Sequence, residues 1–298
     1  MPVRLKPTLR ERLAAATGPL TGLWAASGSP VAAEIMAGSG AELVLVDGEH
    51  SPVGLDGLVP MLQALEAYDA TAIVRVPWND PVLIKQFLDT GAQNLLVPMV
   101  STAEQARAAV AAVSYPDERA SADAGTSGDG RDGDRAARSA ADAGALPARN
   151  GVRGIGSALA RASRWGRVPG YVGRARELVS LVVQIETVEG MGNVREIAAV
   201  EGVDAVFIGP ADLAGSMGLA STPADATVQD AVVETIRACA EAGVKTGVNA
   251  FDPSVAARYR AAGADFVFVS ADVTLMVKGS DAAVAEASQR EAGAAEEY

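Results

Sequence analysis

The chain contains one histidine, His50, which follows two acidic residues at the end of an apolar run. The stretch LVLVDGEHSP, residues 43–52, places Asp47 and Glu49 just before it. An imidazole titrates near physiological pH, so His50 can carry a proton in acid–base catalysis, and Asp47 could orient the ring. The alternative is structural. His50 would then be a loop histidine with its hydrogen bonds satisfied, and Asp47 would form a turn with Gly48.

Two further carboxylates follow later apolar runs. Glu186 lies in SLVVQIET and Asp212 in GPADL. Two carboxylates, with waters and substrate oxygens, suit an octahedral divalent ion such as Mg²⁺, Mn²⁺ or Co²⁺. Gln184 stands two residues before Glu186, on the same face of a strand, where it could bond a ligand or a metal-bound water. The structural alternatives are that Glu186 is the N-terminal charge of the next helix and Asp212 an N-cap.

The candidate cation of the site is Arg75, in the run AIVRVP. Its guanidinium can hold a carboxylate or carbonyl oxygen at two points, although it could instead pair with a neighbouring carboxylate inside the fold. The backbone amides around Gly209, Ala211 and Asp212 lie at an expected helix start, where an anion is favoured. Together the candidates would form a metal site, an anion clamp and one acid–base group.

The elements that must position these residues are eight short apolar runs. We predict strands over residues 22–26, 42–47, 72–77, 94–100, 180–187, 204–210, 245–250 and 265–271. Segments of helical periodicity lie between them, and several end at a glycine. This alternation predicts an α/β fold, a (β/α)₈ TIM barrel, as a single domain over residues 1–298. A doubly wound open sheet is the alternative, but the first turn, AASGSPVAA, lacks its Gly-rich fingerprint.

The candidates come from four different strands, and each lies late in its strand or just beyond it. In (β/α)₈ enzymes the functional end of the barrel is the C-terminal one. The sequence therefore predicts one shared pocket at that end.

Residues 117–150 interrupt the alternation of strands and helices. This stretch consists mostly of Ala, Asp, Gly, Arg and Ser and has almost no large apolar side chain. It cannot bury enough surface to offset its ordering entropy. We predict a disordered insertion between the fourth helix and the fifth strand, with no binding role.

Composition limits the partners of the chain. The net charge is −12 and no Lys/Arg-rich run occurs, so nucleic acid and anionic membranes are poor partners. Cys239 is the single cysteine, which excludes an intramolecular disulfide and a cysteine metal cluster. No apolar run approaches the roughly 20 residues of a membrane span, and the N-terminal segment lacks a signal-peptide core. We expect a cytoplasmic protein.

Six segments carry a family resemblance. They are LVLVDGEHSP, IVRVPWNDP, LDTGAQNLLVPMV, GIGSALARASRW, VVQIETVEGM and DAVFIGPADLAGSMG. With them the chain resembles the HpcH/HpaI family of class II pyruvate aldolases, over nearly its whole length outside residues 117–150. The resemblance implies a (β/α)₈ barrel and a homo-hexamer, built as a trimer of dimers, in which a terminal helix packs on a neighbouring barrel.

The resemblance also implies how the substrate is held. Glu186 and Asp212 would bind a divalent metal ion. Arg75 would bind the pyruvate moiety, supported by Gln184 and by the backbone amide of Ala211.

The remaining implied roles concern the reaction. The family cleaves 4-hydroxy-2-oxo acids to pyruvate and an aldehyde, in the catabolism of aromatic compounds, and oxaloacetate decarboxylation is an expected side reaction. His50 would be the acid–base group, assisted by Asp47. Asp89, in FLDTG, would reach the active site of a neighbouring subunit.

Two features depart from the family pattern. The insertion at 117–150 has no place in the family's short link. The seventh predicted strand reads TGVNAFD, whereas close family members have an apolar run there, at a position that lines the aldehyde pocket. Asn249 therefore suggests a more polar aldehyde.

Two other functions stay open at this point. A related barrel lyase acting on a CoA thioester would need cations for the CoA phosphates, and Arg161, Arg164 and Arg167 could serve. A non-catalytic barrel used as a binding module is the other alternative. Retention of both metal carboxylates and of the histidine argues against it.

Overall fold

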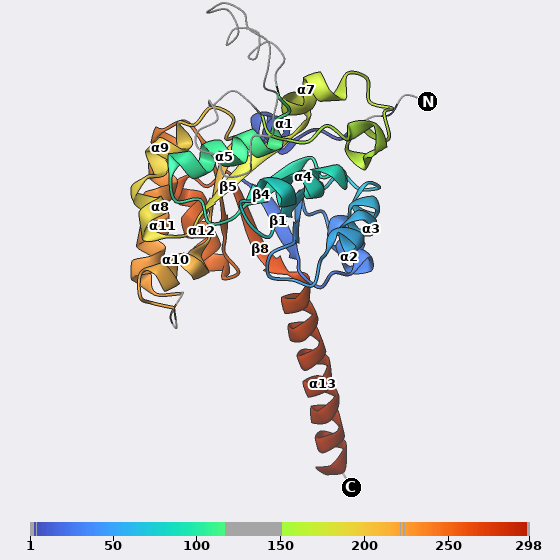
Figure 1. Cartoon of the computed structure of the whole chain (residues 1–298). Coiled ribbons are helices and arrows are strands. Elements are labelled where there is room, and N and C mark those ends of the chain that lie inside the picture. The colour runs from blue at the N-terminus through green and yellow to red at the C-terminus, as the bar shows by residue number, and fades with distance from the viewer. Residues whose placement is uncertain (1–2, 4, 117–150, 221, 223, 297–298) are drawn as a thin grey trace, which may run out of the picture.

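Eight parallel strands form a closed barrel in the computed structural model, which describes residues 3, 5–116, 151–220, 222 and 224–296 (Figure 1). The strands follow one another around the barrel in sequence order, and β8 pairs back to β1. They are β1 (Leu20–Ala25), β2 (Leu43–Asp47), β3 (Thr71–Arg75), β4 (Asn94–Val97), β5 (Ser180–Ile185), β6 (Ala205–Ile208), β7 (Lys245–Asn249) and β8 (Phe266–Ala271). The predicted (β/α)₈ barrel is confirmed, and the open-sheet alternative is wrong.

Helices pack around the strands, at one end of the barrel and, at the chain's C-terminus, away from it. They are α1 (Leu9–Ala15), α2 (Pro30–Gly38), α3 (Leu55–Leu65), α4 (Pro81–Asp89), α5 (Ala103–Val113), α7 (Tyr171–Leu178), α8 (Val188–Gly192), α9 (Val194–Ala198), α10 (Pro210–Ser216), α11 (Ala226–Glu241), α12 (Pro253–Ala262) and α13 (Asp272–Glu296). Two short 3₁₀ helices, η2 (Ser157–Leu159) and η3 (Arg161–Ser163), precede α7. Between β5 and β6 the helical segment is divided into two helices, α8 and α9, which meet at Asn193.

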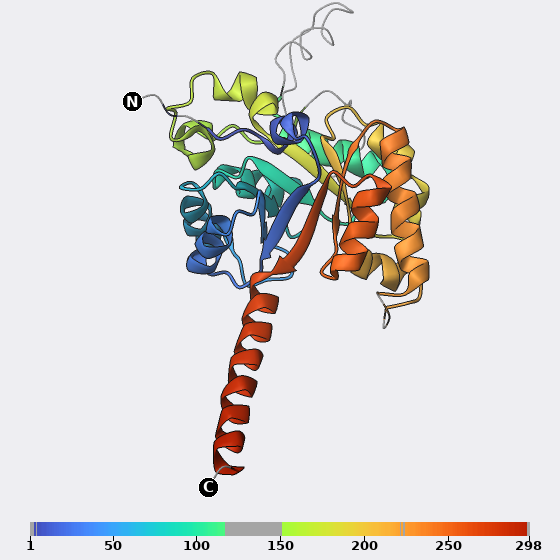
Figure 2. The same cartoon turned by 180° about the vertical axis from the view of Figure 1, so that it is seen from behind.

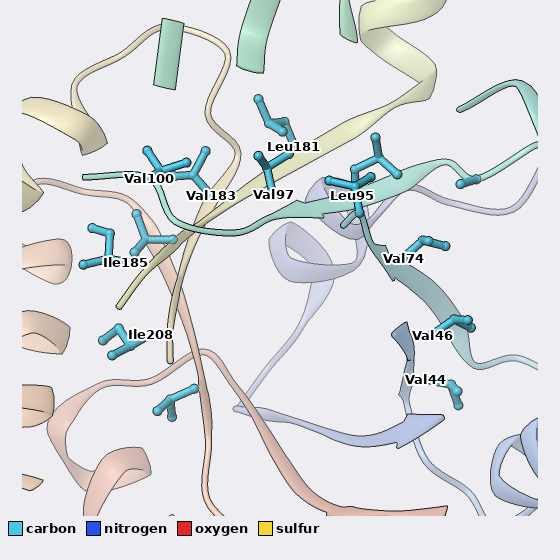
Figure 3. Close-up of a cluster of buried hydrophobic side chains, with 14 of the residues drawn as sticks. Val44, Val46, Val74, Leu95, Val97, Val100, Leu181, Val183, Ile185 and Ile208 are labelled. Carbon is cyan, nitrogen blue, oxygen red and sulfur yellow. The ribbon is translucent and has the colours of Figure 1, made fainter. Parts of the chain in front are cut away.

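Alternation of side chains along each strand builds two apolar layers. Val44 and Val46 of β2 belong to the layer between barrel and helices, part of which is drawn in Figure 3. Leu43 and Leu45 of the same strand belong to a separate cluster with Phe207, inside the barrel. Both layers are buried, which explains why the strands read as nearly continuous apolar runs.

The two ends of the barrel differ in what covers them. At the N-terminal end, α1 places Leu9 and Leu13 in the interior cluster, and Thr8 caps it with a reciprocal capping box. At the other end α13 leaves β8 and projects away from the barrel (Figure 1 and Figure 2). Helix α13 therefore does not close the C-terminal mouth in the way that α1 closes the N-terminal end.

Strand β4 is shorter than predicted. The run 94–100 was expected to be one strand, but β4 ends at Val97. Pro98 has no N–H for the sheet, and Met99 has a left-handed φ of 56°. The chain therefore turns at the mouth of the barrel, where the candidate residues lie.

The predicted disorder of residues 117–150 falls outside the described part of the chain. The segments on either side of it are joined by backbone hydrogen bonds. The Val152 N–H donates to the carbonyl of Ala111 at 2.9 Å, and the Arg153 N–H donates to that of Ser114 at 3.0 Å. The chain thus leaves and re-enters the fold at neighbouring points.

This closeness predicts that residues 117–150 are dispensable for folding. Replacing them with a linker of a few glycines should leave the thermal midpoint unchanged or slightly raised, because each halving of a loop lowers its closure cost by only about 0.6 kcal/mol. Thermal unfolding followed by circular dichroism checks this. A large drop in the midpoint would show that the segment contributes packing that the fold needs.

Candidate functional site

A pocket of about 210 Å³ opens at the C-terminal mouth of the barrel. Seven residues singled out in the sequence line it, namely His50, Arg75, Gln184, Gly209, Ala211, Asp212 and Asn249. They come from β3, β5, β7, α10 and its N-cap, and the loop after β2. The geometry thus brings residues far apart in the chain to one pocket.

Arg75 is the fixed cation of this pocket. Its Nε and Nη2 donate to the two carboxylate oxygens of Asp47, both at 2.8 Å, and its Nη1 lies 2.8 Å from Glu49 Oε2. The guanidinium also stacks on the indole of Trp24, with Cζ 4.5 Å from the ring centroid. A guanidinium has five N–H groups, so donors remain free to point into the pocket. Arg75 therefore pairs with neighbouring carboxylates and lines the pocket at the same time.

Asp47 positions the loop that carries His50. Besides Arg75, its carboxylate accepts the backbone N–H of Glu49 at 3.0 Å and that of His50 at 3.4 Å. The His50 side chain itself is exposed at the mouth, with Nε2 3.8 Å from Glu49 Oε1. Asp47 thus contacts the His50 backbone, and the nearest carboxylate to the imidazole is that of Glu49. Burial raises the pKa of Glu49, and the charge of Arg75 partly opposes this rise.

Glu186 is the most buried carboxylate of the site, with 2% of its surface exposed. Its Oε1 accepts the Met99 N–H at 2.7 Å, and its Oε2 accepts the side-chain amide of Gln184. Burial, with the nearby negative charges of Asp212 and Glu49, raises the pKa of Glu186 to about 7, although the Met99 hydrogen bond lowers it. The carboxylate lacks a positively charged partner among the described residues.

The residues present fit a divalent cation. Because Nε2 of Gln184 donates to Glu186, its Oε1 is the free end of the amide, and that oxygen is buried with no hydrogen-bond partner in the described chain. A cation or its water would satisfy this oxygen and would offset the charge of Glu186. Within the described ranges no cluster of three or more His, Cys, Asp or Glu is arranged to hold a metal. Two protein carboxylates supplemented by water and substrate remain the arrangement that fits.

Gly209 is required beside Glu186. A Cβ at this position would lie 2.7 Å from Glu186 Oε2 and 2.8 Å from Gln184 Nε2. Gly209 precedes α10, where Ala211 and Asp212 are the second and third residues and their N–H groups have no intrahelical acceptor. The absence of a side chain at Gly209 thus lets the start of α10 approach the carboxylate.

Asp89 does not line this pocket. It is the last residue of α4, and its Oδ1 forms an ion pair with Arg153 Nη2 at 3.0 Å. The guanidinium of Arg153 is buried between the rings of Tyr115 and Tyr171. Its expected role at a neighbouring subunit stays a prediction.

Sequence reasoning missed three contributors to the site. Trp24 was read only as part of a strand, yet it stacks on Arg75 and lines the pocket. Glu49 was noted without a role, and it flanks both Arg75 and His50. Met99 gave no signal, because its contribution is a backbone N–H set by a left-handed φ.

Comparison with known proteins shows the family of this chain. Residues 20–279 match the family model described as HpcH/HpaI aldolase/citrate lyase. The chain belongs to this family. It is 42% identical over 267 residues to the "4-hydroxy-2-oxo-heptane-1,7-dioate aldolase" of Salmonella dublin, covering 90% of this chain and 89% of that protein. The same name and the same figures apply to a relative from Salmonella heidelberg.

A solved structure extends the similarity to the whole fold. The HpcH/HpaI aldolase/citrate lyase family protein from Burkholderia cenocepacia is 32% identical, with a TM-score of 0.80, over 94% of this chain and 98% of that one. Family membership and the 42% identical relatives show that this chain is an enzyme, a carbon–carbon lyase of the aldolase type, acting on small molecules. In the described part of the chain, no helix is long and apolar enough to span a membrane.

The raised pKa of Glu186 predicts a pH-dependent stability for the metal-free protein. The unfolded carboxyl has a pKa near 4.5 and the folded one about 7, so the folded state retains the proton at intermediate pH. Stability from this group is present below pH 4.5 and is lost as the pH rises toward 7. Relative to Glu186→Gln, the wild type should lose on the order of 2–3 kcal/mol between pH 5 and pH 8.

Chemical denaturation after chelation, at both pH values, measures this difference. Glu189→Gln, on the exposed start of α8, is the matched control and should track the wild type at both pH values. An equal gap between wild type and Glu186→Gln at pH 5 and pH 8 would contradict the raised pKa.

Proposed function

We propose that this protein is a divalent-metal-dependent aldolase that cleaves and forms 4-hydroxy-2-oxo acids, with pyruvate and an aldehyde as the other side of the equilibrium. The observation that carries the proposal is the single pocket that gathers Arg75, Gln184, Asp212 and His50 beside the buried Glu186. The relatives at 42% identity, named for 4-hydroxy-2-oxo-heptane-1,7-dioate, make that compound the first substrate to assay.

Glu186 and Asp212 would hold the cation, which is expected to be Mg²⁺, Mn²⁺ or Co²⁺ because both donors are carboxylates. When bound, it would supply Lewis-acid chemistry to the 2-oxo acid. Gln184 fixes Glu186 through its amide and offers its free Oε1 to the same region. These three residues would form the metal-binding part of the site.

Arg75 would bind the pyruvate end of the substrate. Asp47 and Trp24 fix its guanidinium, so its remaining N–H groups are preorganised toward an oxygen that gains negative charge when the enolate forms. The Ala211 N–H would hold a carboxylate oxygen in the same way.

His50 would accept the proton of the 4-hydroxyl group. As that proton leaves, the C3–C4 bond breaks, the aldehyde departs, and the electron pair passes to the enolate of pyruvate that Arg75 stabilises. Exposure of the imidazole at the mouth suits this exchange, because the proton must return to C3 or to solvent. In the direction of synthesis the same residues act in reverse.

We also propose a homo-hexamer, a trimer of dimers. Helix α13 extends from the barrel with Leu275, Met276 and Val277 exposed to 47%, 63% and 59%. A helix that projects alone into water gains stability mainly by packing an apolar face on a partner. Packing of α13 on a neighbouring barrel would supply that contact, and Asp89 would reach a neighbour's site in the same assembly.

No observation favours the two alternatives. A CoA thioester lyase would need free cations, but Arg161 and Arg164 both pair with Glu66, at 3.3 and 2.8 Å, and Arg161 also donates to the Thr90 carbonyl. Arg167 is exposed and donates to a backbone carbonyl. A non-catalytic binding module would not need a buried, unpaired carboxylate such as Glu186, which costs stability.

The direct test is pyruvate release from a panel of 4-hydroxy-2-oxo acids, with and without a chelator. We expect activity that is lost on chelation and restored by Mg²⁺, Mn²⁺ or Co²⁺. Full activity after exhaustive chelation would rule out the metal-dependent mechanism. None of the residues lining the pocket is a lysine, so a Schiff base has no ready candidate.

Single substitutions of His50 and of Arg75 should produce different kinetic defects. His50→Ala should lower kcat for aldol cleavage by about 10²–10⁴ with little change in KM. Oxaloacetate decarboxylation has no 4-hydroxyl proton, so it should fall far less in this variant. Arg75→Lys keeps a charge beside the buried Asp47 but loses the two-point contact, so it should impair both reactions.

Steady-state kinetics of both reactions in both variants measures this asymmetry. Equal loss of cleavage and decarboxylation in His50→Ala would overturn the proton-transfer role of His50, and so would cleavage that is unaffected.

A further inference from the structure

The pocket has two chemically different walls. Its ionisable residues, Arg75, His50 and Asp212, come from β3 and from the segments that follow β2 and β6, whereas Asn249 is on β7, across the eight-stranded barrel from β3. Gly247, two residues before Asn249 on the same strand, faces the barrel interior, because a Cβ there would lie 2.0 Å from the Phe266 ring. Alternation places the Asn249 side chain on the same inward face, one layer higher, at the mouth.

Trp24 fixes the orientation of the Asn249 amide. The indole Nε1 donates to Asn249 Oδ1 at 3.0 Å. An indole N–H can only donate, so the amide oxygen must face Trp24 and Nδ2 must face the other way. No described residue accepts a hydrogen bond from Nδ2, and the residue is only half-buried in the pocket lining. The pocket therefore presents an N–H donor at this wall.

The rest of this wall is neutral. Besides Asn249 it is formed by Trp24, Ala26, Phe251 and Ala271. The buried Asp272 lies behind this wall, and its Oδ1 accepts a hydrogen bond from the Ala26 N–H at 2.9 Å. None of the residues that form this wall is positively charged, and Arg75 lies against the ring of Trp24, where it is already paired with Asp47 and Glu49. A negatively charged group beside Asn249 would therefore gain no free cation, and it would lie on the side of the pocket that Asp272 adjoins.

We propose that Asn249, held by Trp24, selects neutral aldehydes that carry a hydroxyl oxygen next to the reacting carbonyl. This inference rests on the proposed aldolase function and specifies its aldehyde. With the 2-oxo acid end held near Arg75, Glu186 and Asp212, the aldehyde portion extends toward β7. Its hydroxyl oxygen accepts the free N–H of Asn249, whereas an alkyl aldehyde leaves that donor unpaired and a carboxylate-terminated aldehyde meets an uncharged wall.

The test compares aldehydes that differ by one oxygen. Glycolaldehyde and acetaldehyde have the same carbon skeleton, and kcat/KM for aldol addition of pyruvate is measured with each. The ratio of kcat/KM for glycolaldehyde to kcat/KM for acetaldehyde in the variant Asn249→Leu gives the intrinsic difference in reactivity of the two aldehydes. We expect the wild-type ratio of glycolaldehyde over acetaldehyde to exceed that of Asn249→Leu about tenfold or more, because a bound aldehyde shields this donor from water and acetaldehyde leaves it unpaired.

A second variant tests the role of Trp24 without replacing Asn249. Trp24→Phe keeps an aromatic ring over Arg75 but removes the donor that orients the amide, so the ratio should fall part of the way toward that of Asn249→Leu. Thermal midpoints of both variants show whether each is folded. Exchange of the pyruvate methyl protons for deuterium in the wild type reports the proposed function separately, since it needs no aldehyde.

If the wild type exchanges the pyruvate methyl protons for deuterium, three results would overturn the inference about Asn249. They are equal ratios in wild type and folded Asn249→Leu, a wild-type preference for acetaldehyde, and a tenfold wild-type preference for succinic semialdehyde over glycolaldehyde. Absence of the exchange in metal-supplemented wild type would instead reject the proposed function.

Discussion

The excess of negative charge at the mouth of the barrel is the constraint on which the rest of the site depends. Glu186 is buried there, Glu49 and Asp212 add to the charge around it, and the pKa of Glu186 rises in response. The cation in this region, Arg75, is already paired with Asp47 and Glu49. Burying an uncompensated carboxylate costs stability, so the arrangement is understandable if a bound cation completes it. The orphaned oxygen of Gln184 points to the same conclusion.

One connected set of contacts crosses the mouth of the barrel. It begins at Asp47, passes through Arg75 and the indole of Trp24, and ends at Asn249. The backbone N–H groups that Asp47 accepts attach the His50 loop to the same set. The group that would bind pyruvate, the group that would move the proton and the wall that would receive the aldehyde are thus held by a single network, which makes their relative positions rigid.

The barrel and most of the pocket could be predicted from the sequence. Strands buried on both faces leave long apolar runs, and polar residues at their C-terminal ends, such as Arg75 and Glu186, are conspicuous in that background. Contributions that depend on backbone geometry could not be predicted. Met99 acts through an N–H in a left-handed conformation, and Gly209 through the side chain it lacks. The hydrogen bond between Trp24 and Asn249 joins residues 225 positions apart in the sequence and leaves no local pattern.

The most direct test of this account is metal binding itself. Titration of metal-free protein with Mn²⁺, followed by electron paramagnetic resonance or calorimetry, should show one ion per chain. Asp212→Asn removes one carboxylate from a position exposed to solvent and should weaken binding by about 100-fold or more, with the fold intact. Binding of equal strength in wild type and Asp212→Asn, or no binding by the wild type, would contradict the claim that a cation completes the charge at the mouth of this barrel.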